Sequence, residues 1–463
     1  MKAVVFTESG QEYGYGHFYR CMALAGSFLG RGVATDFYIK GTVPENTDDF
    51  FVLEKDWTAD NEFIKNTVIG YDFVIIDSYT AYSEIYTIAS RNSVCIFLDD
   101  YNRISYTEGL VVNGAVSAVR SVYPENFGTE YLLGSRYALL RGEFLDISPK
   151  IINENIRNIL ITLGGTDNHN LIEKILSVAT RKFPEACLNV VSNSSGISGN
   201  NIFLYNNLSS PEMKRLMSEA DLAISAAGQT LNELAVCGVP TLAFKIADNQ
   251  SENLKGWVES GFIDKETDLI SLEADLRGIT ETKTRELRSL AGQQTIDGKG
   301  ADRVVKTAFK RRLSGEMIVW EAQADDITDL FHLANDREVR QNSFNSDPIP
   351  FDDHKKWLDS IIISDTSYLY IFRISGRFIG QVRFDIKEHE TVTGISINSD
   401  FRGLGVGKVM LERALEKITD KSITLPVTAY IKENNTASVK IFESAGYKVI
   451  SRNECIIRME YGF

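Results

Sequence analysis

Short apolar runs separated by helical patterns fill residues 1–312 and constrain the fold more than any other feature. The first round of runs predicts buried strands at Ala3–Phe6, Thr35–Ile39, Phe73–Ile76, Val94–Leu98 and Leu110–Val112. A second round starts near Arg157 and predicts strands at 158–163, 188–191, 202–204, 222–225 and 241–244. Strands that alternate with helices form parallel sheets covered on both faces. We therefore expect two successive α/β domains, at residues 1–150 and 151–312.

The chain from Met317 onward has a different character. Strand-like segments are mixed with helical patterns, at Tyr368–Arg373, Phe378–Phe384 and Val392–Ile397 for the strands and at 325–334, 351–362 and 408–418 for the helices. This mixture predicts a third, α+β domain at residues 317–463. The stretch 297–313 reads as a helix that closes the second domain, and the short basic segment 311–316 reads as a linker.

Composition limits the classes of function. The chain has 463 residues, a formal net charge of −14 and five scattered cysteines without metal-ligand spacing. The negative charge disfavours binding to nucleic acid or to an anionic membrane. The cysteines indicate neither a disulfide framework nor a zinc site, and we expect no metal. No signal peptide or long apolar run is recognisable, which predicts a cytoplasmic enzyme.

The segment 14–20, Gly-Tyr-Gly-His-Phe-Tyr-Arg, follows the first predicted strand and precedes a helical pattern. A strand, a glycine turn and a helix N-terminus are typical of an anion-binding site. Here the turn also carries His17, a side chain whose ordinary pKa suits proton transfer near neutral pH. The alternative is a histidine that only caps or packs.

Further polar residues stand where predicted strands end, which is where α/β sheets bind their ligands. Asp77 and Tyr79 follow one strand and Asp100 follows the next; capping or turn formation is the alternative role for the two aspartates. In the second domain, small residues at 164–167 and 225–228 allow a backbone to approach a phosphate closely, and Glu233 could accept hydrogen bonds from ribose hydroxyls.

Taken together, these residues resemble the GT-B class of nucleotide-sugar enzymes and, more narrowly, the UDP-sugar hydrolases of pseudaminic acid biosynthesis. The resemblance covers residues 1 to about 312 and rests on Gly14–His17 with Arg20, Asp77 with Tyr79, Gly164–Asp167, Asn232 with Glu233, Asn249 with Gln250, and Asp297–Ala301. It implies two Rossmann-like domains in a GT-B arrangement. One departure concerns the sugar contacts, because Ser78 stands where the family often has a histidine.

The resemblance also implies roles for individual residues. His17 would be the general base that activates a water molecule for attack on the anomeric carbon while UDP leaves. The remaining UDP-sugar contacts would come from Gly16, Arg20, Asp77, Tyr79, Gly165, Thr166, Ala226, Gly228, Glu233, Asn249 and Gln250. Among these, Glu233 would bind the ribose, Gly165 and Gly228 would lie near the phosphates, and Tyr79 and Asn249 would hold the sugar.

The third domain resembles the GCN5-related N-acetyltransferases (GNAT). A glycine loop that opens a helix would cradle the pyrophosphate of acetyl-CoA, the implied cosubstrate, through Arg402, Gly403, Leu404, Gly405, Val406, Gly407 and Lys408. The later motif residues are Asn435, Ser438, Phe442, Gly446 and Tyr447. A plain turn and helix cap is the alternative for the loop. Many members have a tyrosine that protonates the leaving thiolate where this chain has Phe442, and a phenyl ring cannot do so.

These resemblances predict a bifunctional enzyme that binds two small molecules, a UDP-sugar and acetyl-CoA. It would acetylate the 4-amino group of a UDP-amino-sugar and hydrolyse UDP from UDP-2,4-diacetamido-2,4,6-trideoxy-β-L-altrose. The candidates for deprotonating the amine are a water chain along the strand at Ser396 and Asn398, or Asp400. Three alternatives stay open: a GT-B glycosyltransferase that passes the sugar to an acceptor, the same two activities on another UDP-amino-sugar, and a non-catalytic nucleotide-sugar-binding scaffold.

Overall fold

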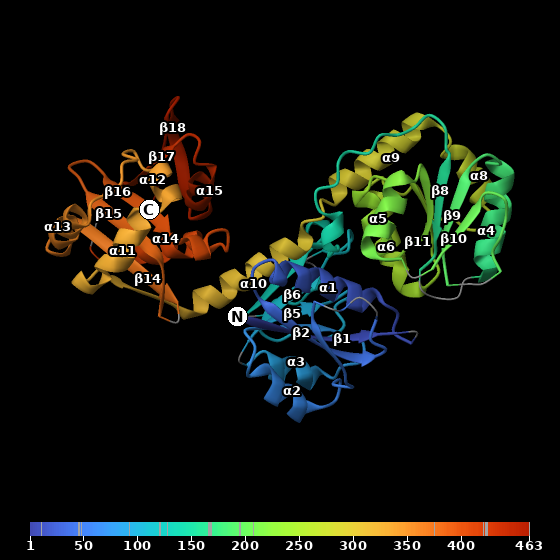
Figure 1. Ribbon diagram of the computed structural model, residues 1–463, viewed down its shortest axis with the longest axis horizontal. Helices are drawn as coiled ribbons and strands as arrows, with labels where there is room; N and C mark the ends of the chain where they lie inside the picture. Colours follow the sequence, from blue (N-terminus) through green and yellow to red (C-terminus); the bar gives the residue numbers. More distant parts are fainter. Residues whose placement is uncertain are drawn as a thin grey trace. The chain divides into compact units, whose positions relative to one another are not determined.

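The computed structural model describes residues 1–10, 12–44, 47, 49–91, 93–119, 122–126, 128–164, 169–193, 196–206, 208–374, 376–419, 421 and 425–462, apart from the side chain of Asn249. Two compact units divide the chain, Met1–Ala308 and Phe309–Phe463. Figure 1 shows parallel sheets in the first unit and a separate sheet, coloured orange to red, in the second.

The first sheet of unit 1 is parallel throughout, with strand order β3-β2-β1-β4-β5-β6-β7. Its strands are β1 (Lys2–Ser9), β2 (Ala34–Gly41), β3 (Phe51–Glu54), β4 (Phe73–Asp77), β5 (Val94–Leu98), β6 (Gly109–Asn113) and β7 (Thr129–Leu133). The five predicted strands are confirmed, and the two edge strands, β3 and β7, were not predicted. From β1 the strands continue through β2 to β3 on one side, and from β4 to β7 on the other side. The direction of the strand order therefore changes between β1 and β4, and the crevice outside the carboxyl ends of these two strands is the expected ligand site.

The α-helices of this part follow β1, β3 and β4. They are α1 (Gly16–Leu29), α2 (Asn61–Val68) and α3 (Ser83–Ala89), followed by the 3₁₀ turns η2 (Ser135–Tyr137) and η3 (Gly142–Phe144). An apolar core under α2 and α3 includes the fully buried Trp57 and Phe97. This core fixes the sheet on which the polar strand ends are mounted.

The second sheet of unit 1 is also parallel, with strand order β10-β9-β8-β11-β12. Its strands are β8 (Asn158–Thr162), β9 (Cys187–Val191), β10 (Ile202–Tyr205), β11 (Leu222–Ala226) and β12 (Thr241–Phe244). The helices are α4 (His169–Lys182), α5 (Ser210–Glu219), α6 (Thr230–Val236), η4 (Asp248–Gln250), α7 (Ser251–Glu259), α8 (Leu272–Gly278) and α9 (Thr282–Thr295). Two apolar cores, one containing Leu160 and one containing Ile161, lie on opposite faces of the sheet because neighbouring strand residues point to opposite sides. The five predicted strands are confirmed.

Helix α10 (Gly300–Glu316) corrects two expectations about the end of unit 1. The helix expected at 297–313 begins three residues later, because Gly298 adopts φ +75° and forms a turn first. The segment 311–316, expected as a linker, is the last part of this helix. The boundary between the two units therefore falls within α10, after Ala308.

Unit 2 contains a mixed sheet with strand order β13-β14-β15-β16-β17-β19-β18, in which only the β16–β17 pair is parallel. The strands are β13 (Met317–Glu321), β14 (Ser367–Ile374), β15 (Arg377–Ile386), β16 (Thr391–Ile397), β17 (Val427–Lys432), β18 (Tyr447–Arg452) and β19 (Ile456–Tyr461). The helices are η5 (Ala324–Asp326), α11 (Ile327–Ala334), α12 (Arg337–Asn342), α13 (Phe351–Ile362), η6 (Ser399–Phe401), α14 (Val406–Thr419) and α15 (Thr436–Ser444).

The predicted fold class, two Rossmann-like parallel sheets followed by an α+β domain, is confirmed by these sheets. None of the helices that the structure describes is both long enough and apolar enough to cross a membrane.

Candidate active site

His17 lies in the first turn of α1, directly after a glycine turn at the end of β1. Gly10 and Gly14 pair across this turn, with the Gly14 N–H donating to the Gly10 carbonyl at 2.7 Å. Gly14 adopts φ +75°, a conformation that glycine reaches without strain. The predicted succession of strand, glycine turn and helix is confirmed, but α1 begins at Gly16, within the segment expected as the turn. His17 therefore lies in the helix, where it is only 6% exposed.

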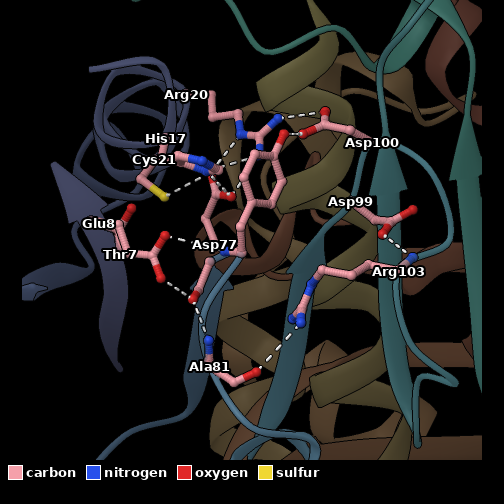
Figure 2. Close-up of polar contacts among 12 residues, drawn as sticks. Thr7, Glu8, His17, Arg20, Cys21, Asp77, Ala81, Asp99, Asp100 and Arg103 are labelled. Atoms are coloured by element: carbon pink, nitrogen blue, oxygen red, sulfur yellow. Dashed lines mark hydrogen bonds and ion pairs between the residues drawn. The ribbon is translucent and has the colours of Figure 1, made fainter. Parts of the chain in front are cut away.

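Asp77, the last residue of β4, joins His17 to Arg20. Its Oδ1 lies 2.6 Å from His17 Nδ1, and both carboxylate oxygens accept from the Arg20 guanidinium, at 2.5 Å from Nε and 2.6 Å from Nη2. Figure 2 shows these three side chains converging. Burial alone would raise the pKa of Asp77, but Arg20 and His17 outweigh it and lower that pKa to about 2. Asp77 is therefore ionised at neutral pH.

The ionised Asp77 fixes how the imidazole of His17 is protonated. A carboxylate only accepts hydrogen bonds, so His17 Nδ1 must carry a hydrogen. Arg20 Nη2 lies 3.1 Å from the same nitrogen because both groups donate to Asp77 Oδ1. In the neutral ring, Nε2 is then the nitrogen with the free lone pair. This is the arrangement that a general base requires.

Tyr79 and Asp100 extend this network along the strand ends. Arg20 Nη1 donates to Asp100 Oδ1 at 2.7 Å, and the Tyr79 hydroxyl donates to the other oxygen of Asp100. The Tyr79 ring stands edge-on to the His17 ring, with centroids 4.4 Å apart. Burial, followed by the charge of Asp100, raises the pKa of Tyr79, so its hydroxyl stays protonated. Tyr79 is 38% exposed and can still contact a ligand.

Glu8, which was not predicted as a site residue, organises the loop that follows β4. It is fully buried near the end of β1 and accepts from Ser78 Oγ, Thr80 Oγ1 and the backbone N–H groups of Tyr79 and Thr80. Ser78 is 3% exposed and holds the same loop, since its Oγ also accepts from the Ala81 N–H at 2.8 Å. Ser78, which stands where the resembling family often has a histidine, is therefore a buried residue that stabilises this loop. The end of β1 at a switch point of the sheet was the signal that could have identified Glu8.

Glu233, expected at the ribose, forms an ion pair on α6. Its Oε1 accepts two hydrogen bonds from Arg141, at 3.0 Å from Nε and 2.7 Å from Nη2. Arg141 was not predicted. It lies between η2 and η3, where the chain passes from the first sheet to the second, in a segment without a periodic pattern.

The other residues expected around the nucleotide lie near the end of β11. Ala226 is the last residue of this strand, and a Cβ added to Gly228 would lie 3.6 Å from Gln250 Nε2. Gln250 Oε1 in turn accepts from the Ile246 N–H at 3.0 Å. The structure thus brings Ala226, Gly228 and Gln250 together. Gly165 and Thr166 lie outside the described residues, as does the side chain of Asn249.

In unit 2, the glycine loop leads into α14 as expected. Gly403 and Gly405 adopt φ +74° and +77°, so the loop turns twice through conformations that favour glycine. Arg402 lies at its base, where it donates to the Ile397 carbonyl and pairs with Asp336 at 2.6 Å and with Glu338 at 2.9 Å. Leu404 is half-buried and Val406 is buried under the first turn of α14.

Several residues expected at acetyl-CoA have structural partners here. A Cβ on Gly407 would come within 2.9 Å of Ile397 Cδ1 and 3.0 Å of Ile441 Cδ1, so its lack of a side chain lets α14 approach its neighbours. Lys408 pairs with Glu412 one turn along the helix. Asn435 caps α15 by accepting from the Ser438 N–H at 3.1 Å.

Strands β16 and β17 diverge beside this loop. They pair only from Thr391 with Val427 to Thr393 with Ala429, although β16 continues to Ile397 and β17 to Lys432. Beyond Thr393, no residue in the described part of β17 pairs with β16. On the edge that faces away from β15, the backbone N–H and carbonyl groups of this part of β16 therefore have no ladder partner in β17.

The sequence of this region settles what the fold is. Residues 317–448 match the sequence model of the family described as "Acetyltransferase (GNAT) domain". This part of the chain, called the GNAT domain below, has the fold of that family. The matched residues include strands β16 and β17, the glycine loop, and helices α14 and α15.

Three relatives extend the comparison to the rest of the chain. An uncharacterized protein of Methanocaldococcus jannaschii is 25% identical and is matched over 97% of each chain. The pseudaminic acid cytidylyltransferase and UDP-2,4-diacetamido-2,4,6-trideoxy-beta-L-altropyranose hydrolase of Helicobacter pylori is 29% identical over 47% of this chain and 42% of that protein. The spore coat polysaccharide biosynthesis protein SpsG of Bacillus subtilis is 25% identical over 66% and 96%. The expected resemblance, to a pseudaminic acid pathway hydrolase joined to a GNAT domain, is confirmed.

Phe442 of the GNAT domain is 3% exposed and packs edge-on against Tyr447, with ring centroids 4.9 Å apart. The residues considered for amine deprotonation lie at the end of β16. Asp400 pairs with Arg377 at 2.9 Å, and Asn398 accepts from the Asp400 N–H as the cap of η6. Both polar groups therefore hold the turn before the glycine loop.

Proposed function

We propose that unit 1 hydrolyses a UDP-sugar and that the GNAT domain acetylates the amine of its precursor. The substrate of hydrolysis is UDP-2,4-diacetamido-2,4,6-trideoxy-β-L-altrose, and the GNAT domain acetylates the 4-amino group with acetyl-CoA. The hydrogen bond between His17 Nδ1 and the ionised Asp77 carries the hydrolytic part of the proposal, because it leaves Nε2 as the base. The similarity to the Helicobacter pylori protein supports the choice of sugar.

Hydrolysis then needs one displacement. His17 Nε2 accepts a proton from water, the water oxygen bonds to the anomeric carbon, and the bond from that carbon to the β-phosphate oxygen breaks. UDP leaves with the electron pair, and the free sugar carries the new hydroxyl. Asp77 stabilises the imidazolium that forms, and Arg20 keeps Asp77 ionised. A single displacement inverts the anomeric configuration.

In this proposal the first half of the unit, residues 1–150, holds the sugar through Gly16 and Tyr79. Arg20 and the fully buried Asp77, both expected at the sugar, act on it through His17 instead. The second half, residues 151–312, holds UDP, with Glu233 at the ribose and Gly165, Thr166, Ala226 and Gly228 near the phosphates. Asn249 and Gln250 contact the sugar from this half.

Acetyl transfer forms a bond from the amine nitrogen to the acetyl carbon and breaks the thioester C–S bond. The glycine loop, with Gly403 and Gly405, presents the first turn of α14 to the pyrophosphate of acetyl-CoA. The residues from Arg402 to Lys408, with Asn435 and Phe442, line the cosubstrate. The amine nitrogen loses one proton as its bond to the acetyl carbon forms, and the thiolate takes up one proton as it leaves. Because Phe442 has no ionisable proton, water relays the proton from the amine to the thiolate.

The hydrolytic role is tested by UDP release from the acetylated UDP-sugar. We expect His17→Asn to lower kcat about 10²- to 10⁴-fold, the range for loss of a general base. His389→Asn is the matched control, because His389 is 86% exposed in unit 2. Full UDP release by His17→Asn would overturn the role, and release that requires an added acceptor would identify a glycosyltransferase.

The acetyltransferase role is tested by release of free CoA thiol in the presence of the UDP-4-amino-sugar. We expect Gly403→Ala to raise KM for acetyl-CoA about tenfold, because a displaced loop loses hydrogen bonds from its backbone N–H groups to the charged pyrophosphate. Gly376→Ala is the control, because Gly376 has a similar φ of +79° in the turn between β14 and β15 and equal space for a Cβ. Equal effects of the two substitutions, or no acetylation by the unaltered chain, would contradict the proposal.

A further inference from the structure

The ion pair between Arg141 and Glu233 is asymmetric. Both hydrogen bonds from Arg141 reach Glu233 Oε1, at 3.0 Å and 2.7 Å. Among the residues that the structure describes, none donates to Oε2. A carboxylate accepts hydrogen bonds on both oxygens, so Oε2 keeps its capacity for another donor.

The surroundings of Glu233 determine which donor suits Oε2. The side chain is 14% exposed, and burial raises its pKa while Arg141 acts against that rise. Because Arg141 already balances the charge of Glu233, a neutral hydroxyl suits the second oxygen better than a further cation. The vicinal hydroxyls of a ribose are donors of this kind.

Arg141 is itself held from several directions. Its Nη1 donates to Ser210 Oγ at 2.8 Å. Its guanidinium carbon lies 5.1 Å from the ring centre of Tyr19 and 5.4 Å from that of Phe144. Hydrogen bonds along its edge and rings beside it orient the guanidinium, so it acts on a ligand through Glu233 and not by direct contact.

We propose that Arg141 is a positioning residue for nucleotide recognition: it fixes Glu233 by Oε1 and presents Oε2 to the ribose hydroxyls of a nucleoside diphosphate. This inference rests on the proposed function of unit 1, namely the binding of UDP. It adds Arg141 as the residue that holds Glu233 in the position from which Glu233 distinguishes a ribose from a deoxyribose.

The test compares the affinities of the full-length chain for UDP and for 2′,3′-dideoxy-UDP, measured by isothermal titration calorimetry. We expect the unaltered chain to prefer UDP about 10- to 100-fold, the effect of a hydrogen bond to a charged group. Arg141→Met should reduce this preference to about twofold at pH 6, and Arg141→Lys should retain part of it. Arg215→Met is the matched control, because Arg215 forms an exposed pair with Glu219 on α5.

A pH series separates positioning from a purely electrostatic role. Arg141→Met removes the group that holds Glu233 by Oε1, so the preference should stay lost at both pH 6 and pH 8. A preference that returns at pH 8 would show that Arg141 only keeps Glu233 ionised, and would overturn the positioning role. The unaltered chain should show a constant preference over this range. If Arg141→Met lowers the affinities for UDP and for 2′,3′-dideoxy-UDP by the same factor, this inference is overturned but the proposed function is not. Failure of the unaltered chain to bind UDP would overturn both the inference and the proposed function.

Discussion

Asp77 is the residue on which the proposed chemistry of unit 1 depends, because it pairs with both His17 and Arg20. In Asp77→Asn, the amide no longer selects the His17 tautomer and leaves Arg20 with Asp100 as its charged partner. We expect kcat for UDP release to fall at least about 100-fold and the free energy of unfolding to fall by about 3 kcal/mol. Asp56→Asn is the control, since Asp56 is 64% exposed. An Asp77→Asn chain with full activity would show that His17 needs no such partner.

The same carboxylate predicts how stability depends on pH. The folded-state pKa of Asp77 is about 2, below the ordinary value of 3.8. A lowered pKa means that the stabilisation is present above about pH 4 and is lost as pH falls toward 2. We expect a loss of about 1 kcal/mol by pH 3 and about 2 kcal/mol in all. Urea unfolding at pH 5 and pH 3 should show this extra loss in the unaltered chain and not in Asp77→Asn; parallel losses would contradict it.

The residues that sequence could foresee are those with a local signal. His17 follows a glycine turn between a strand and a helical pattern, and Asp77 ends an apolar run, so both were predicted. Arg141 and Glu233 are 92 positions apart, and Arg141 lies in an irregular segment, so only the folded chain brings them together. Glu8 was hidden because a polar residue after an apolar run also reads as the solvated end of a strand.

Strands were predicted where complete burial requires a continuous run of apolar residues. Strands in the middle of the parallel sheets have such runs, and β4 is buried along its whole length. The edge strand β3 has only four residues, three of them exposed, and β7 begins with two polar residues and has only one buried residue, so neither contains a long buried apolar run. The linker expected at 311–316 was wrong because a basic composition does not interrupt a helix, and α10 continues to Glu316.

Helix α10 allows a matched pair of glycine substitutions. A Cβ on Gly300 would lie 2.0 Å from the Ala138 carbonyl oxygen, whereas one on Gly315, in the same helix, would meet nothing within 4 Å. We expect Gly300→Ala to destabilise unit 1 by about 2 kcal/mol or more, because backbone must move. Gly315→Ala should stabilise the chain by up to about 1 kcal/mol. Thermal unfolding measures both, and equal effects would show that α10 does not pack this closely on the segment before Arg141.

At the scale of the whole molecule, two units of different fold share one chain, and each contains a site built from its own residues. The His17 network lies entirely within residues 1–308, and the glycine loop lies within residues 309–463. The two proposed reactions are therefore separable by substitution. They are also ordered, because acetylation of the amine produces the diacetamido sugar that hydrolysis consumes.

This order predicts the product balance in a single reaction with the UDP-4-amino-sugar and acetyl-CoA. Free CoA should appear before UDP, and the two should reach a ratio of one to one. His17→Asn should release CoA and accumulate the acetylated UDP-sugar. Gly403→Ala should slow both products, and adding acetylated UDP-sugar made beforehand should restore UDP release alone. If UDP leaves the unacetylated amino-sugar equally fast without acetyl-CoA, hydrolysis does not depend on the acetyl group, and the two activities do not form consecutive steps.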